Sequence, residues 1–135
     1  KHLTDHSTLY PGVREVLEEL KDYKKAVISN KREVLSVKLL KDLGILHHFN
    51  LVVGSDTTPE RKPSPQPILF ALSKLGVDSN RTVIVGDSNL DIIAGKRANI
   101  KTIGVTYGYR PAELLKDADF LIATIEELKN IIFIL

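Results

Sequence analysis

Three short polar segments of the chain carry side chains that bind phosphate or a divalent cation in proteins. Ser29 and Asn30 follow one apolar stretch, and Asn30 opens an expected helix whose free backbone N–H groups and dipole favour an anion. Asp87 ends another apolar stretch, and Asp91 comes one helical turn later, so both carboxylates can face one point. Lys62 lies in RKPSP, whose prolines restrict where its ammonium points. These residue types indicate phosphate binding beside Mg²⁺, which takes a couple of carboxylates and otherwise binds water and phosphate.

The segments that carry Asn30 and Lys62 also have ordinary structural explanations. Asn30 and Glu33, three residues later, have the spacing of a helix cap, so capping and phosphate binding both stay open here. A lone lysine in a loop is usually a solvated surface residue, so Lys62 is informative only together with the other two segments.

The two aspartates differ in how well a structural role explains them. Ser88 can cap a helix with Asp91 at its third position, where a carboxylate offsets the helix dipole, and this alternative to metal binding stays open. Asp87 caps nothing obvious at the end of its apolar stretch. Burying a carboxylate there costs free energy unless a cation or several donors offset it, so Asp87 is the stronger metal-ligand candidate.

Weaker candidates are histidine, tyrosine and arginine residues near predicted turns and the N-terminus: His2, His6, His47, His48, Tyr107, Tyr109 and Arg110. The two N-terminal histidines have the i, i+4 spacing of a metal pair, but chain ends are prone to fray. The second histidine pair is expected on the surface. The last three residues follow an expected strand and could shape the mouth of a site.

Five short apolar stretches are expected to be the strands that position these residues. They are rich in Val and Ile and run nearly continuously apolar, as buried parallel strands do. Their bounds are Lys25–Ser29, Leu51–Gly54, Thr82–Asp87, Thr102–Val105 and Phe120–Ala123. Strands that alternate with helices predict an open parallel α/β sheet, in which ligands bind beyond the carboxyl ends of the strands.

Helical patterns separate these stretches. Helices are expected to begin near Pro11, Lys31, Ser88, Pro111 and Thr124, with another after the proline-rich segment. In the second of these helices, Leu35, Leu39 and Leu43 form the expected apolar stripe. The last helix should begin with a capping box made by Thr124 and Glu127.

Composition excludes several classes of protein. The 135 residues suit a single domain, residues 1–135, and the formal net charge of +2 with scattered Lys and Arg supports no nucleic-acid partner. The chain has no Cys, so it holds no disulfide or thiol nucleophile, and a cytoplasmic location is expected. Its apolar runs are shorter than the roughly 18 residues of a membrane span, so no membrane association is expected. The sequence leaves the choice between monomer and homodimer open.

The three polar segments together resemble motifs of a known superfamily. ISNK after one strand, RKPSP in the following loop and GDSNLDIIAGKRAN after another strand are similar, in order and spacing, to the second, third and fourth motifs of the haloacid dehalogenase superfamily of phosphohydrolases. YPGVREVLEELK and VVGSDTTPERKPSPQPILFALSKLGV resemble its phosphoglycolate phosphatase group. The resemblance covers nearly the whole chain and implies a three-layer Rossmann-like parallel sheet.

The resemblance implies a role for each polar residue. Ser29 would bond a phosphoryl oxygen, with Asn30 helping to position it, and Lys62 would balance charge on the nucleophile and the phosphate. Asp87 would bind Mg²⁺, and Asp91 would support the metal directly or through water. The implied reaction is Mg²⁺-dependent hydrolysis of a small phosphorylated metabolite, such as 2-phosphoglycolate, through an aspartyl-phosphate.

The chain departs from the family pattern at the nucleophile. No Asp-x-Asp-Gly occurs in it, and Asp117 and Asp119 precede a strand instead of ending one. The chain also lacks Met, so we expect Lys1 to lie inside a longer gene product that supplies the nucleophile and a helical cap. The missing strand would lie between the strands that end at Ser29 and Asp87, so the sheet would be incomplete at its centre. The segment alone is therefore expected to be inactive and poorly stable.

Other functions stay open. The core chemistry also fits a phosphomutase or a pyrophosphatase. A chain without a nucleophile could instead be a non-catalytic module that binds Mg²⁺ and an anion. A phospho-accepting signalling domain is a third alternative, although RKPSP has no place in it.

Overall fold

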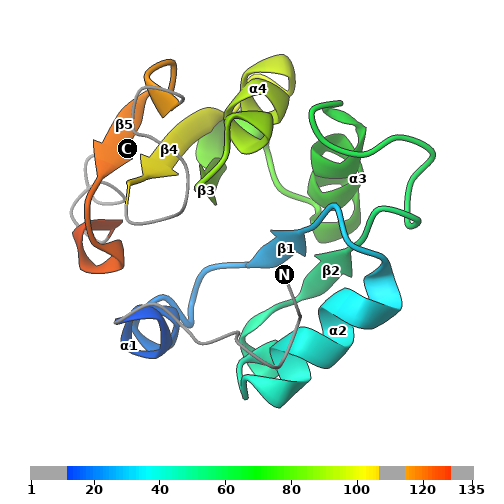
Figure 1. Ribbon diagram of the computed structural model, residues 1–135, viewed down its shortest axis with the longest axis vertical. Helices are drawn as coiled ribbons and strands as arrows, with labels where there is room; N and C mark the ends of the chain where they lie inside the picture. Colours follow the sequence, from blue (N-terminus) through cyan, green and yellow to red (C-terminus); the bar gives the residue numbers. More distant parts are fainter. Residues whose placement is uncertain (1–11, 107–114, 129–135) are drawn as a thin grey trace.

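The computed structural model describes residues 12–106 and 115–128, which form alternating helices and short strands (Figure 1). In chain order they are α1 (Val13–Glu19), β1 (Ala26–Ile28), α2 (Glu33–Asp42), η1 (Leu46–His48), β2 (Leu51–Val53), α3 (Gln66–Leu75), η2 (Ser79–Arg81), β3 (Val83–Gly86), α4 (Asn89–Arg97), β4 (Lys101–Val105), β5 (Phe120–Ile122) and η4 (Ile125–Glu127). The expectations for His2, His6, Tyr107, Tyr109 and Arg110, and for helix starts at Pro11 and Pro111, lie outside the described residues.

All five predicted strands are present, and every described pairing is parallel. β1 pairs with β2 in one sheet, with Ala26 opposite Leu51. A second sheet has the order β3-β4-β5, with Val83 opposite Lys101 and Ile103 opposite Phe120. The structure therefore confirms the parallel α/β class that the continuous apolar runs predicted.

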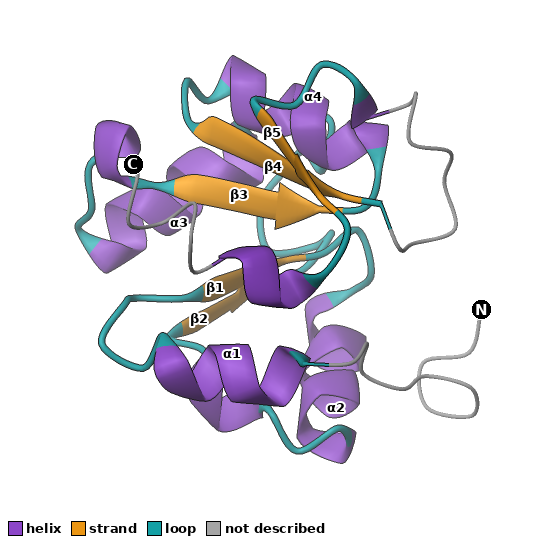
Figure 2. Ribbon diagram, turned by 90° about the vertical axis from the view of Figure 1, so that its left-hand side faces the viewer, coloured by secondary structure: helices purple, strands orange, loops and turns teal. Residues whose placement is uncertain are grey.

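The two sheets meet at the strands that were expected to lack a neighbour. Within residues 12–106 and 115–128, β1 and β3 are both edge strands and do not pair with each other. Figures 1 and 2 both show β1 and β3 as the facing edges of the two sheets. This arrangement matches the prediction of a sheet that is incomplete at its centre, between the strands ending near Ser29 and Asp87.

One helical layer joins the two sheets. Ile68 of α3 and Ala94 of α4 belong to a buried cluster that also contains Ala98 and Ile100. Ile28 of β1 and Ile84 of β3 pack against that cluster from the two sheets. Apolar burial across this layer therefore holds β1 and β3 on a common support, although no strand pairing links them.

The opposite face of the β3-β4-β5 sheet carries the third layer. Val16 of α1 packs there with four buried residues of the sheet and its C-terminal end: Ile103, Val105, Ile122 and Leu128. Val83 and Val85 of β3 point to this face, whereas Ile84 points to the other. β3 is covered on both faces, which explains its uninterrupted apolar sequence.

The capping box at Thr124 was predicted correctly, but the apolar stripe of α2 was not. Thr124 and Glu127 form the expected capping box, and Gly76 ends α3 with a left-handed φ of 64°. The predicted stripe of α2 is wrong at Leu35, which is 42% exposed, because the helix turns Ser36 and Leu40 inward instead. No helix in the described ranges combines the length and apolar character needed to cross a membrane.

Candidate active site

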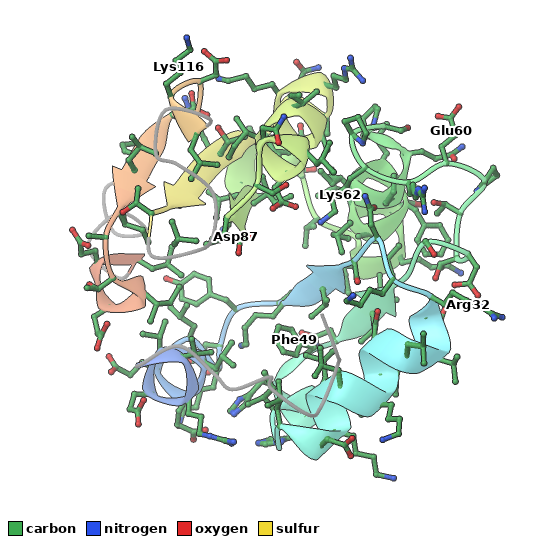
Figure 3. The ribbon with its side chains drawn as sticks, viewed as in Figure 1. Arg32, Phe49, Glu60, Lys62, Asp87 and Lys116 are labelled. Atoms are coloured by element: carbon green, nitrogen blue, oxygen red, sulfur yellow. The ribbon has the colours of Figure 1, made fainter. Side chains whose placement is uncertain are left out.

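Lys62 and Asp91 form a nearly buried ion pair between the two halves of the fold. The Lys62 Nζ lies 2.5 Å from Asp91 Oδ1, and each side chain is 11% exposed. The same ammonium donates to the carbonyl of Ile28 at 2.7 Å. Lys62 therefore links the proline-rich loop to the end of β1 and to the start of α4. Figure 3 shows Lys62 and Asp87 in the region between the two sheets.

Ser29 lies directly after β1, next to the carbonyl that Lys62 binds. Its N–H donates to the carbonyl of Val53 at 2.8 Å, which extends the pairing of β1 with β2 by one residue. The Ser29 Oγ accepts a hydrogen bond from the N–H of Lys31 at 3.0 Å. Because a hydroxyl both donates and accepts, its hydrogen can still be donated to an oxygen outside the chain.

Asn30 binds the backbone of Lys62 and does not cap a helix. Its Nδ2 donates to the Lys62 carbonyl at 3.0 Å, and its Oδ1 accepts from the Lys62 N–H at 3.1 Å. The N-cap of α2 is Arg32, which makes no side-chain capping bond. The capping interpretation of Asn30 with Glu33 is therefore wrong, because the amide is engaged with a loop 32 residues away.

A carboxylate of the chain itself occupies the N-terminus of α2. Asp56 Oδ1 accepts from the N–H of Glu33 at 2.8 Å, and this bond, helped by Arg32, holds the pKa of Asp56 below its ordinary value. Gly54 lies so close to this helix end that an added Cβ would overlap the Glu33 backbone. The sequence predicted that the N–H groups at the start of this helix are free to bind an anion. That prediction is wrong for the N–H of Glu33, which binds the Asp56 carboxylate instead.

The helix that begins after β3 carries both aspartates. Ser88 is the N-cap of α4 and accepts from the N–H of Leu90 at 3.0 Å, which confirms the capping role considered for it. Asp91 is in the first turn and 8% exposed. An added Cβ at Gly86 would overlap its carboxylate, so glycine is required for this packing. Asp91 therefore serves the helix end and Lys62 together.

Asp87, unlike Asp91, has no polar partner among the described residues. It is partly buried at the end of β3, and it makes no hydrogen bond or ion pair with any residue in 12–106 or 115–128. In the same ranges, no three His, Asp or Glu side chains gather as a metal cage. One or two carboxylates with the rest left to water and phosphate is the donor set that suits Mg²⁺, so Asp87 and Asp91 fit that ion.

Two other groups considered in the sequence lie at the opposite edge of the sheets. His47 and His48 precede β2, with ring centroids 4.1 Å apart, and burial together with His47 lowers the pKa of His48. Asp119 precedes β5 and accepts from the N–H and hydroxyl of Thr102 at 2.8 and 3.0 Å. Because parallel strands begin at one edge and end at the other, these residues are remote from Ser29 and Asp87.

Sequence reasoning missed Asp56 and Arg97 as supporting residues and missed the supporting role of Asn30. Asp56 caps α2, Asn30 holds the Lys62 backbone, and Arg97 Nη1 donates to the carbonyl of Pro63 at 3.4 Å. Each contact joins residues more than 20 positions apart, so no local spacing announces it. The one sequence signal for the contact between Asn30 and Lys62 was that their two motifs are expected at the same edge of the sheet, beyond the carboxyl ends of the strands.

The fold and these contacts define a parallel α/β protein with polar side chains gathered at the carboxyl ends of its strands. Residues 1–105 match the family described as haloacid dehalogenase-like hydrolase, and the chain belongs to that family. This finding confirms the resemblance stated from the three motifs.

Curated and solved relatives agree with that membership. The phosphoglycolate phosphatase of Chromobacterium violaceum is 42% identical over 133 residues, covering 97% of this chain and 60% of the relative. That of Aquifex aeolicus is 43% identical, covering 82% and 59%. A crystal structure described as a predicted phosphoglycolate phosphatase from Haemophilus somnus superposes with a TM-score of 0.88 at 34% identity, covering 96% and 59%. The chain therefore spans about 60% of the length of these relatives.

Proposed function

We propose that this chain is the C-terminal portion of the core domain of a phosphatase that hydrolyses a small phosphomonoester. The observation that carries the proposal is the convergence at Lys62, whose ammonium lies 2.7 Å from the Ile28 carbonyl and 2.5 Å from Asp91. Ser29 follows Ile28 directly, and Asp87 precedes Asp91 by one helical turn. A hydroxyl donor, a cation and two carboxylates near the carboxyl ends of β1 and β3 are groups that phosphoryl transfer can use, since positioning and charge stabilisation dominate its catalysis.

Each side chain has a separate task in this proposal. Ser29 donates its hydroxyl hydrogen to a phosphoryl oxygen, and the Lys62 ammonium offsets the negative charge of the phosphate and of the attacking carboxylate. Asp87 would hold Mg²⁺, and Asp91 would support the ion directly or through water. The bound ion would screen the anionic groups that must approach each other. The attacking aspartate, which would form the aspartyl-phosphate, lies outside this chain, so the 135 residues alone are proposed to be inactive.

The substrate we propose is 2-phosphoglycolate. The support is that the two curated relatives named above are phosphoglycolate phosphatases that cover most of this chain. A phosphomutase, a pyrophosphatase and a non-catalytic module that binds Mg²⁺ and an anion are the alternatives. A cytoplasmic location and a monomeric or dimeric state stay predictions from the sequence.

The experiment is phosphate release by the full-length protein from 2-phosphoglycolate, pyrophosphate and a hexose 1-phosphate, with Mg²⁺ and with EDTA. We expect Mg²⁺-dependent release that is fastest from 2-phosphoglycolate and is strongly reduced, but still measurable, in Lys62→Met. The matched control is Lys116→Met, which removes an exposed lysine elsewhere. Transfer of phosphate to a second hydroxyl without release would favour the mutase, and binding without turnover would favour the module.

A further inference from the structure

We propose that Asn30 is a positioning residue whose amide fixes the backbone of Lys62 and thereby places the Lys62 ammonium beside Ser29 and Asp91. The inference rests on the proposed function, and it changes the role expected of Asn30 from a phosphate contact to a support for the lysine.

Asn30 satisfies both polar groups of the Lys62 backbone. One amide hydrogen of Nδ2 binds the Lys62 carbonyl at 3.0 Å, while Oδ1 receives the Lys62 N–H at 3.1 Å. A primary amide is suited to this paired contact, because it presents a donor and an acceptor side by side. Both bonds are partly buried, so neither backbone group is readily compensated by water if the amide is removed.

The same lysine is held at its other end. The ammonium donates to Ile28 and pairs with Asp91, and Arg97 binds the carbonyl of Pro63, the next residue in the loop. A lysine side chain is flexible, so its ammonium keeps one position only when the backbone end and the charged end are both held. Ile28 is the last residue of β1, and Ser29 and Asn30 follow it directly. The two contacts of Lys62 with Ile28 and Asn30 therefore place the ammonium close to Ser29 in the fold.

The paired bonds to Lys62 fix the orientation of the Asn30 amide, so it cannot turn toward a ligand without breaking them. They leave one Nδ2 hydrogen and one Oδ1 lone pair unused. Aspartate would keep the acceptor but would turn a second oxygen, in place of the N–H donor, toward the Lys62 carbonyl. Asn30→Asp is therefore expected to disturb the loop almost as much as Asn30→Ala, although its size and shape are conserved.

The chain offers a matched control. Asn50 Oδ1 accepts from the N–H of Lys25 at 2.9 Å, which is also an asparagine holding a lysine backbone. Asn50 precedes β2, at the edge opposite Ser29, and belongs to none of the machinery described above. Asn50→Ala removes a similar bond without touching Lys62.

The first measurement is a double-mutant cycle in the full-length protein with 2-phosphoglycolate. Asn30→Ala is expected to lower kcat by about tenfold, within the range of coupling between residues in contact, with a smaller change in KM. In a Lys62→Ala background the same change should have little further effect, because no ammonium remains to be placed. Asn50→Ala should leave kcat and KM unchanged. An undiminished loss in the Lys62→Ala background would overturn the proposal, because Asn30 would then act independently of the lysine.

The second measurement does not depend on activity. The rate at which an amine-reactive reagent labels Lys62, read by mass spectrometry, should rise in Asn30→Ala and Asn30→Asp and stay unchanged in Asn50→Ala. Thermal melts establish that each variant is folded at the labelling temperature. An unchanged labelling rate of Lys62 in both folded Asn30 variants would overturn the inference. If the protein labels as expected but hydrolyses no phosphate ester, the proposed function fails while the support of Lys62 by Asn30 stands.

Discussion

The ammonium of Lys62 lies 2.5 Å from the carboxylate of Asp91, a residue 29 positions later in the chain, and both side chains are nearly buried. Two opposite charges that are withdrawn from water attract each other strongly, and removing one of them leaves the other buried without a partner, which costs free energy. This pair is also the contact that brings the loop carrying Lys62 against the start of α4. The stability of the fold and the chemistry proposed for the site therefore both depend on the pair of Lys62 and Asp91.

Breaking this pair should destabilise the fold. Lys62→Met is expected to lower the free energy of unfolding by about 3–5 kcal/mol, because the buried Asp91 loses its partner. Urea unfolding followed by circular dichroism measures the loss. The double variant Lys62→Met with Asp91→Asn should recover part of it, since no unpaired charge remains. If the two single losses add without recovery, the pair is not coupled in the way the structure shows.

Gly86→Ala should displace Asp91. A Cβ at Gly86 would overlap the Asp91 carboxylate, so we expect a loss of roughly 1–3 kcal/mol in stability and a strong drop in phosphatase turnover. Gly76→Ala is the control, because Gly76 has a left-handed φ of 64° and open space around its Cβ position. That variant should lose stability through backbone strain and keep its kcat. Full turnover in a folded Gly86→Ala protein would show that the placement of Asp91 is unimportant.

Stability at acidic pH should depend on Asp119. The N–H of Thr102, joined by the Thr102 hydroxyl and Lys96, holds the pKa of Asp119 below its ordinary value. The carboxylate therefore stabilises the fold above its unfolded-state pKa of about 3.9, and this contribution disappears as the pH falls through the lower folded-state pKa.

Urea unfolding at several pH values below about 5 measures this contribution. Asp119→Asn should show a shallower fall in unfolding free energy than the parent as the pH is lowered. Thr102→Val removes only the hydroxyl and keeps the N–H, so it should retain most of the pH dependence. Identical slopes for the parent and Asp119→Asn would contradict the assignment.

Binding of Mg²⁺ should depend on Asp87. Asp87 is the aspartate at the end of β3 that has no partner among residues 12–106 and 115–128, so we expect Asp87→Asn to abolish the calorimetric signal of Mg²⁺ titration. Asp117→Asn makes the same charge change at an exposed position near the opposite edge and should bind Mg²⁺ normally. Equal Mg²⁺ affinity in the two variants would remove Asp87 from the metal site.

The sequence predicted the elements better than the contacts between them. The strands were recognisable by their apolar residues, and β3 shows the reason: it lies between α1 and the α3–α4 layer, and a strand covered on both faces is apolar throughout. β5 is not covered in this way, because its Leu121 is 48% exposed. The capping box at Thr124 was recognisable because both of its partners are local. Leu35 was misplaced because a leucine row does not reveal which face of a helix meets the sheet, and α2 turned Ser36 inward.

The site shows the same division. The motifs predicted that Lys62 lies close to the segment that carries Asp91, because both follow the carboxyl ends of parallel strands, and the structure shows this contact. The partners of Asn30 and Asp56 were not predictable from the sequence. Asn30 binds Lys62 and Asp56 binds Glu33, and in each pair the two residues are more than 20 positions apart. Such choices are made by tertiary packing, which local spacing does not encode.

The account rests on Ser29, Lys62 and Asp87 serving one phosphoryl group. A crystal structure of the full-length protein with Mg²⁺ and orthovanadate, a mimic of the transferring phosphoryl group, tests this most directly. We expect vanadate within hydrogen-bond distance of Ser29 Oγ and Lys62 Nζ, with Mg²⁺ held by Asp87. Vanadate bound away from these three side chains, or Mg²⁺ held without Asp87, would contradict the account.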